Sequence, residues 1–159
     1  MEPFAIVTRE TPSLRERSQE VDPKEITTPA FQAYLDRLSV TMLVKDGVGI
    51  ASPQAGRNIR VIVVLIDDMP TCFINPVITK ASEAKVQDEE GCLSVPGIYG
   101  LVERHKRIKI EALNRHGRRI TVDARHFLAI VLQHEIDHLD GILFIDKMIK
   151  QTGTGGKHI

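Results

Sequence analysis

The chain has 159 residues, of which 42% are hydrophobic and 26% are charged, as in an ordinary globular domain. Its formal net charge is zero and it has no long basic run, which argues against direct recognition of nucleic acid or binding to an anionic membrane. No apolar stretch approaches the length of a membrane span, and the start of the chain lacks the charge and apolar pattern of a leader peptide. We expect a single cytoplasmic domain over residues 1–150 and a flexible tail over 151–159.

The first long element is a predicted helix that begins at Pro29, with Thr28 as its N-cap. Apolar residues then recur at steps of four, three and four, which forms one face of an amphipathic helix. These residues are Phe31, Leu35, Leu38 and Met42. We expect Gly47 to end the helix.

Strands are predicted next along the chain. The Val- and Ile-rich run over 60–66 is typical of a buried strand, and the turn over 67–70 leads to a second strand over 71–78. Farther on, Ile108 and Ile110 alternate with charged residues, and the turn over 114–117 leads to a strand over 118–122. This pattern predicts a hairpin.

A second helix is predicted over 125–139, ended by Gly141. Its apolar residues surround most of the helix axis, which indicates a buried helix. They are Phe127, Leu128, Ile130, Val131, Leu132 and Ile136. The predicted fold class is therefore α+β, with mixed or antiparallel β-sheets packed around a central buried helix that carries the sequence His-Glu-Ile-Asp-His over 134–138.

This sequence matches the pattern H-E-x-x-H, which combines a metal site with a base. On a helix, His134 and His138 project from the same face and can bind one divalent metal, while Glu135 can accept a proton from a water. Such a match arises by chance about once in a hundred sequences of this length, so it needs support from other segments.

A third ligand is better sought upstream than downstream of this motif. Downstream, Asp140 follows His138 too closely. Upstream, Cys92 lies in Glu-Gly-Cys-Leu-Ser-Val-Pro-Gly over 90–97, where glycines and a proline allow a tight backbone. The alternative, a small buried hydrophobic residue, is common for a lone cysteine, and we assign Cys72 to that class.

The segment over 47–54, Gly-Val-Gly-Ile-Ala-Ser-Pro-Gln, is a third candidate. No Lys-Ser/Thr follows its Gly-x-Gly, so it does not predict a phosphate loop. Small residues that end in Gln54 suggest close approach to an extended ligand, with an amide donor at the end. An ordinary loop explains the pattern equally well.

Taken in chain order, the three segments resemble the motifs of the peptide deformylase family, G-φ-G-φ-A-A-x-Q, E-G-C-φ-S and H-E-φ-D-H, where φ is apolar. Ser52 replaces the second alanine, and we expect only a minor effect on the pocket wall. The resemblance extends to about Lys147. It implies a metal-dependent hydrolase that removes the N-formyl group from formylmethionyl peptides, with release of formate, as new proteins mature.

The resemblance also implies the roles of individual residues. Cys92, His134 and His138 would hold one divalent metal ion, Fe(II) in the cell, with Zn, Ni or Co as alternatives. Glu135 would accept a proton from the attacking water and pass it to the leaving amine. The side-chain amide of Gln54 and the backbone N–H of Leu93 would stabilise the oxyanion.

The substrate contacts follow from the same resemblance. The peptide backbone would pair with Val48, Gly49 and Gly91, and Tyr99 would lie near the residues after methionine. The methionine pocket would be lined by Phe127, Ile130 and Val131, although core packing explains Phe127 equally well.

Further expectations concern neighbouring residues and partners. Glu90 and Arg104 would form an ion pair beside the Cys92 loop, and His126 stands where relatives tend to have glycine. The partner would be a nascent formylmethionyl peptide in a bacterium, and the protein a monomer. The short C-terminus gives only weak support for docking on the ribosome.

Two other functions stay open from the sequence. The first is a metallohydrolase that acts on another amide, and the second is a domain with a structural metal. A structural site usually has a fourth protein ligand and no use for Glu135 or Gln54.

Overall fold

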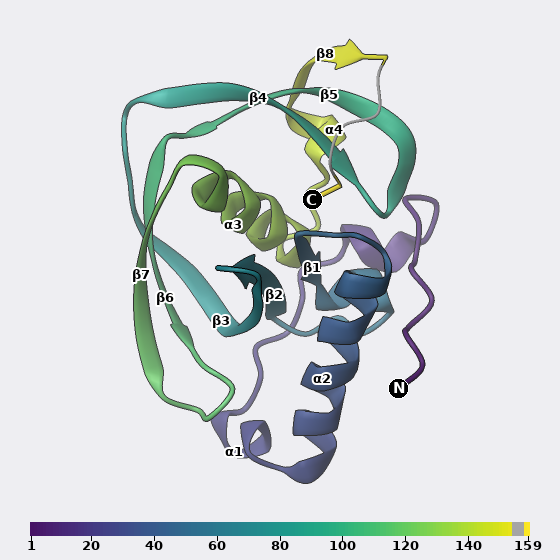
Figure 1. Cartoon of the computed structure of the whole chain (residues 1–159), viewed down its shortest axis with the longest axis vertical. Coiled ribbons are helices and arrows are strands. Elements are labelled where there is room, and N and C mark those ends of the chain that lie inside the picture. Colours follow the sequence, from purple (N-terminus) through teal and green to yellow (C-terminus); the bar gives the residue numbers. More distant parts are fainter. Residues whose placement is uncertain (154–157) are drawn as a thin grey trace.

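Two antiparallel sheets and two long helices form the molecule, and the computed structural model describes residues 1–153 and 158–159 (Figure 1). Its helices are η1 (Pro12–Arg15), α1 (Pro23–Ile26), α2 (Pro29–Val44), η2 (Ser52–Ala55), α3 (His126–Leu139) and α4 (Phe144–Lys147). Its strands are β1 (Gly49–Ala51), β2 (Val61–Ile66), β3 (Met69–Ala81), β4 (Lys85–Cys92), β5 (Val95–His105), β6 (Arg107–Leu113), β7 (Arg119–Arg125) and β8 (Met148–Thr152). The α+β class with antiparallel sheets agrees with the prediction.

The larger sheet has the strand order β1-β2-β3-β6-β7, so most neighbours in it are also neighbours along the chain. Asp67 and Asp68 both have positive φ angles, 51° and 61°, as a two-residue hairpin turn requires. Pairing resumes at once, with Met69 opposite Ile66. The predicted four-residue turn is therefore wrong in its second half, because Met69 and Pro70 belong to β3.

The smaller sheet has the order β4-β5-β8, and the sequence patterns predict none of its strands. Cys92 pairs with Val95, so Leu93 and Ser94 form the tip of the β4–β5 hairpin. The β4 strand, Lys-Val-Gln-Asp-Glu-Glu-Gly-Cys, is largely polar and becomes buried only at its end. Since alternation of apolar residues is the main sign of a strand, this strand gives little signal in the sequence.

Helix α2 begins as predicted, because the Thr28 side chain accepts a hydrogen bond from the Phe31 N–H. It ends earlier than predicted, at Val44, and Asp46 rather than Gly47 adopts the left-handed conformation, with φ of 54°. Its apolar face packs on β1 and β2. The face is buried there in a cluster that includes Leu35, Leu38 and residues of β2.

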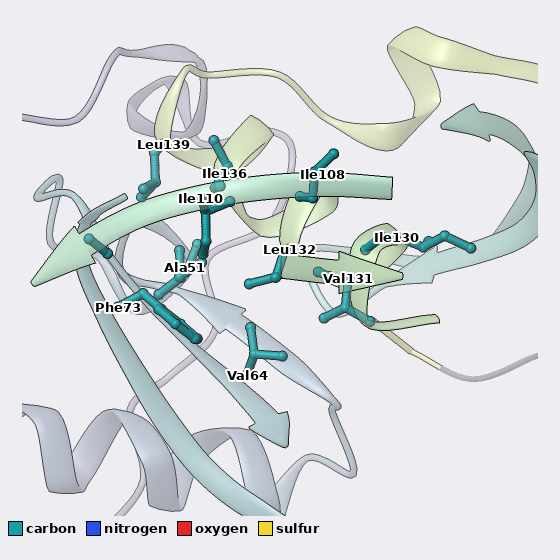
Figure 2. Packing of buried hydrophobic residues seen from close by; sticks show 14 of the residues in the cluster. Ala51, Val64, Phe73, Ile108, Ile110, Ile130, Val131, Leu132, Ile136 and Leu139 are labelled. Carbon is teal, nitrogen blue, oxygen red and sulfur yellow. The ribbon is translucent and has the colours of Figure 1, made fainter. Parts of the chain in front are cut away.

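Helix α3 packs against β1, β2, β5 and β7, and ten of its residues are buried. Figure 2 shows its apolar side chains, such as Leu132 and Val131, near Val64 and Phe73 of the larger sheet. Its first residue, His126, has φ of 53°, which explains why a glycine would suit this position. Beyond its end, Gly141 has φ of 73°, and a Cβ atom there would lie 2.3 Å from the Arg15 carbonyl oxygen.

The described parts of the segment predicted to be a flexible tail make contacts with the rest of the protein. Gln151 and Thr152 belong to β8 and pair with β5. His158 and Ile159 form backbone hydrogen bonds, and Ile159 is buried. Residues 154–157, which the same prediction covers, lie outside the described residues. No helix in the described part of the chain is long and apolar enough to cross a membrane.

Candidate metal centre

Three side chains from two elements converge at the centre of the site. Cys92 lies at the end of β4, and His134 and His138 lie one turn apart on α3. One ligand atom from each residue lies within 4.8 Å of the others, and all three residues are buried. The Cys92 Sγ and His138 Nε2 atoms are 3.3 Å apart. The structure thus brings together the three residues predicted to hold a metal.

The donor set fits a divalent metal. The His134 Nε2 atom is buried and has no hydrogen-bond partner among the described residues. Because a buried polar atom without a partner costs free energy, a ligand at this place would stabilise the site. The group contains three donors among the described residues, which is the number that catalytic zinc sites usually provide.

A buried ion pair orients His134. Glu90 Oε1 accepts a hydrogen bond of 2.8 Å from His134 Nδ1, so the lone pair of His134 is left on Nε2, facing Cys92 and His138. Arg104 donates two bonds of 2.8 Å to the same carboxylate and one of 2.6 Å to Asp137. The expected pair between Glu90 and Arg104 is therefore present, and it also contacts a metal ligand, which the sequence did not predict.

Burial and hydrogen bonding set the protonation states. Burial would raise the pKa of Glu90, but hydrogen bonds from Arg104 and His134 outweigh it and lower that pKa to about 2. Burial raises the pKa of the Cys92 thiol to about 12. Burial also lowers the pKa of His138 well below its usual value, with the neighbouring His134 adding to the effect. His138 is thus neutral at neutral pH, as a metal ligand must be.

Glu135 lies next to these residues on α3. Its two carboxylate oxygens are buried without a hydrogen bond among the described residues. Burial, and then the nearby Glu90 carboxylate, raise its pKa well above the usual value. A Cβ atom on Gly49 would lie 2.6 Å from Glu135 Oε1, so the carboxylate packs directly on the Gly49 backbone. The close approach of Glu135 therefore explains why position 49 is a glycine.

Gln54 is held with its amide nitrogen beside Cys92. Its Oε1 accepts a bond of 2.9 Å from the Ala51 N–H, and its Nε2 lies 3.2 Å from Ser94 Oγ and 3.5 Å from Cys92 Sγ. Leu93 follows Cys92 at the hairpin tip. The neighbouring Ser52 hydroxyl donates to the Arg57 carbonyl and bonds with Tyr34 on α2. It thus ties this segment to α2.

The predicted substrate residues flank the metal ligands. Val48 precedes β1, Gly91 is the last residue but one of β4, and Tyr99 pairs with Gly91 across the hairpin. A Cβ atom on Gly91 would lie 2.5 Å from the Tyr99 ring. The Val48 N–H donates to the His158 carbonyl at 3.4 Å, and the Gly91 carbonyl accepts from the Ile159 N–H at 3.1 Å.

A cavity of about 250 Å³ opens beside these residues. It is lined by Val48, Leu65, Asp67, Asp68, Phe127, Leu128 and Val131. Three of the predicted substrate residues, Val48, Phe127 and Val131, thus share one cavity. Ile130 does not line it and lies instead in the buried cluster of α3 and the larger sheet.

The comparisons with known proteins agree on one family. The family model described as "Polypeptide deformylase" matches residues 3–153. A peptide deformylase of Desulfitobacterium hafniense is 46% identical over 147 residues, which cover 92% of this chain and 95% of that protein. One from Syntrophomonas wolfei is 45% identical over 150 residues, which cover 94% and 96% of the two chains.

Solved structures show the same fold. The crystal structure of peptide deformylase from Thermotoga maritima matches with a TM-score of 0.89 at 35% identity, and the match covers 93% of this chain and 99% of that one. A class I type b peptide deformylase from Acinetobacter baumannii, bound to Met-Ala-Ser, matches with a TM-score of 0.88 at 32% identity. That match covers 92% of this chain and 99% of the other.

Proposed function

The chain belongs to the polypeptide deformylase family, and we propose that the residues assembled above carry out the family's reaction. The protein is a metallohydrolase that removes the N-formyl group from formylmethionyl peptides and releases formate. The observation that carries our assignment of roles is the convergence of Cys92, His134 and His138 beside the buried carboxylate of Glu135, which has no hydrogen bond to any described residue.

Cys92, His134 and His138 would hold the metal, with α3 as the central helix that presents the two histidines. When bound, a divalent cation polarises the formyl carbonyl and lowers the pKa of a nearby water. We propose Fe(II) in the cell, although zinc, nickel and cobalt also suit one thiolate and two imidazoles. Cytoplasmic location, a monomeric state and ribosome docking stay predictions.

Glu135 would move the proton. Water attacks the formyl carbon and gives its proton to a Glu135 carboxylate oxygen. As the bond between carbon and nitrogen breaks, the same oxygen returns the proton to the leaving amine, so the products are formate and a free N-terminus. Burial keeps the pKa of this carboxylate high, which suits a group that must both accept and return a proton.

Gln54 and Leu93 would stabilise the negative charge on the formyl oxygen. The bond from the Ala51 N–H fixes the Gln54 side chain, and its Nε2 then points toward Cys92. A donor fixed in this way needs no reorganisation during the reaction. We infer that the backbone N–H of Leu93 is the second donor, because the hairpin tip holds Leu93 directly after the Cys92 ligand.

The peptide would bind as an added strand. Val48, Gly49 and Gly91 would pair with its backbone, a mode that tolerates many sequences. Phe127, Ile130 and Val131 would surround the methionine side chain, and Tyr99 would contact the residues that follow.

The test is an anaerobic assay of formate release from formyl-Met-Ala-Ser by iron-loaded protein, next to Glu135→Gln. We expect the substitution to lower kcat about 10²- to 10⁴-fold while the bound metal stays at one per chain. Gln54→Leu should lower kcat about 10²- to 10³-fold. Metal binding without formate release by the wild type would contradict the proposed function, and full activity of Glu135→Gln would remove Glu135 from the mechanism.

A further inference from the structure

One peptide group near the end of the chain lies between two strand segments of the site. The carbonyl oxygen of His158 accepts a hydrogen bond from Val48, and the N–H of Ile159 donates to Gly91. The C=O and N–H of a trans peptide point in opposite directions, so this single group bridges the start of β1 and the end of β4. An added strand between two neighbours makes the same contacts.

The side chains of this pair contact residues that the proposed function assigns to the peptide substrate. Ile159 is 1% exposed and belongs to the same buried cluster as Ile130 and Val131. His158 lies against Tyr99, with 5.6 Å between the ring centroids and 3.2 Å between the Tyr99 hydroxyl and His158 Nε2. Figure 1 shows this end of the chain close to α3.

We propose that His158 and Ile159 are an intramolecular competitor of the formyl peptide and occupy the substrate groove, the surface formed by Val48, Gly91 and Tyr99, until substrate displaces them. The proposal rests on the proposed function, because the pair occupies Val48, Gly91 and Tyr99, which that function assigns to the substrate. The pair runs in the opposite direction to a substrate, whose first residue would enter the apolar pocket. Here the later residue, Ile159, is buried, and the earlier one contacts Tyr99.

A competitor of this kind changes KM and leaves kcat unaltered. The apparent affinity for substrate is the intrinsic affinity reduced by the fraction of molecules with an open groove. If about one molecule in five is open, the apparent KM is about five times the intrinsic value. Two backbone hydrogen bonds, one apolar side chain and the contact of His158 with Tyr99 are few enough contacts for a peptide substrate to displace.

The experiment compares the wild type with the double variant His158→Gly, Ile159→Asp. His158→Gly removes the imidazole ring that contacts Tyr99, and Ile159→Asp disfavours burial of the side chain at position 159. We expect KM for formyl-Met-Ala-Ser to fall about fivefold with kcat unchanged. Lys150→Ala, an exposed change on β8, is the matched control and should leave both constants at the wild-type values.

A second measurement does not depend on turnover. The Val48 amide hydrogen should exchange with solvent faster in the double variant than in the wild type, because its acceptor has left. If no form of the protein releases formate, the proposed function fails, and faster exchange at Val48 in the double variant then shows only that His158 and Ile159 cover this strand segment. Equal exchange at Val48, or a KM that is unchanged or raised in an active double variant, would overturn it.

Discussion

Replacing Arg104 by methionine should destabilise the protein through Glu90, its partner. Both side chains are almost fully buried, with 2% and 0% exposed, and two hydrogen bonds join them. Methionine keeps most of the apolar stem but removes the charge and the donors. It therefore leaves a carboxylate in the interior without its main partner.

Two routes give the size of this effect. Removing one member of a buried ion pair typically costs about 3–5 kcal/mol. The fall in the pKa of Glu90 from 4.5 to about 2 corresponds to about 3 kcal/mol, and the hydrogen bond from Arg104 is the largest of the contributions that lower it. We expect Arg104→Met to lower the free energy of unfolding by about 3 kcal/mol at pH 7.

The pH dependence distinguishes this cause from simple loss of packing. Because folding lowers the pKa of Glu90, its contribution to stability is present above pH 4.5 and is lost as the pH falls through about 2. The difference between wild type and variant should therefore shrink as the pH is lowered from 7 to about 3. Urea unfolding of the metal-free proteins at each pH measures it.

Arg60→Met is the matched control. Arg60 is also buried, but its partner Asp140 is 41% exposed, so water can solvate that carboxylate once the arginine is gone. We expect a smaller loss, about 1 kcal/mol, mainly from the bond to the Leu139 carbonyl. If Arg104→Met costs no more than Arg60→Met, or its cost does not change with pH, the reasoning about Glu90 is wrong.

Three further outcomes follow from the site and α3. Metal binding should release about one proton from the Cys92 thiol, whose pKa is about 12, so the affinity for metal should rise about tenfold per pH unit near neutrality. Calorimetry in two buffers counts the released protons, and the use of Glu135→Gln ensures that none of them comes from Glu135. Gly49→Ala should lower kcat about 10²-fold by displacing Glu135, whereas Gly153→Ala, where a Cβ atom meets none of the described residues, should leave kcat unchanged. His126→Gly should raise the free energy of unfolding by about 1 kcal/mol in urea titrations, because φ is 53° there; an unchanged midpoint would contradict strain at this residue.

Local patterns predicted the elements whose signals are local. The Thr28 cap and the apolar steps after it gave the start of α2, because both depend on neighbours within a turn or two. By contrast, β4 is paired through its backbone and is mostly polar, so its sequence lacks the alternation of apolar and polar residues that predicts a strand. The composition of the tail suggested mobility, yet His158 and Ile159 are placed by partners at Val48 and Gly91, far away in the sequence.

The residues of the site also fall into two groups, those that a local pattern predicts and those whose contacts only the fold shows. Helical spacing alone predicted that His134 and His138 share a face, whereas the prediction of Cys92 as the third ligand needed the resemblance to the motifs of the family. The hydrogen bond from His134 to Glu90 joins residues 44 positions apart. No pattern within either segment contains that contact, so only the fold reveals how the first histidine is oriented.

The motif on α3 also contributes a contact besides the side chains proposed as two ligands and a base. Its fourth residue, Asp137, accepts a bond from Arg104, which also holds Glu90, and Glu90 in turn holds His134. Arg104 of β5 thus fastens β4, which carries Cys92, to the helix that carries the histidines. Because ligand positions within one metal site must agree closely, loosening this link should weaken metal binding as well as folding. The loss of metal affinity in Arg104→Met, measured next to its loss of stability, tests that connection.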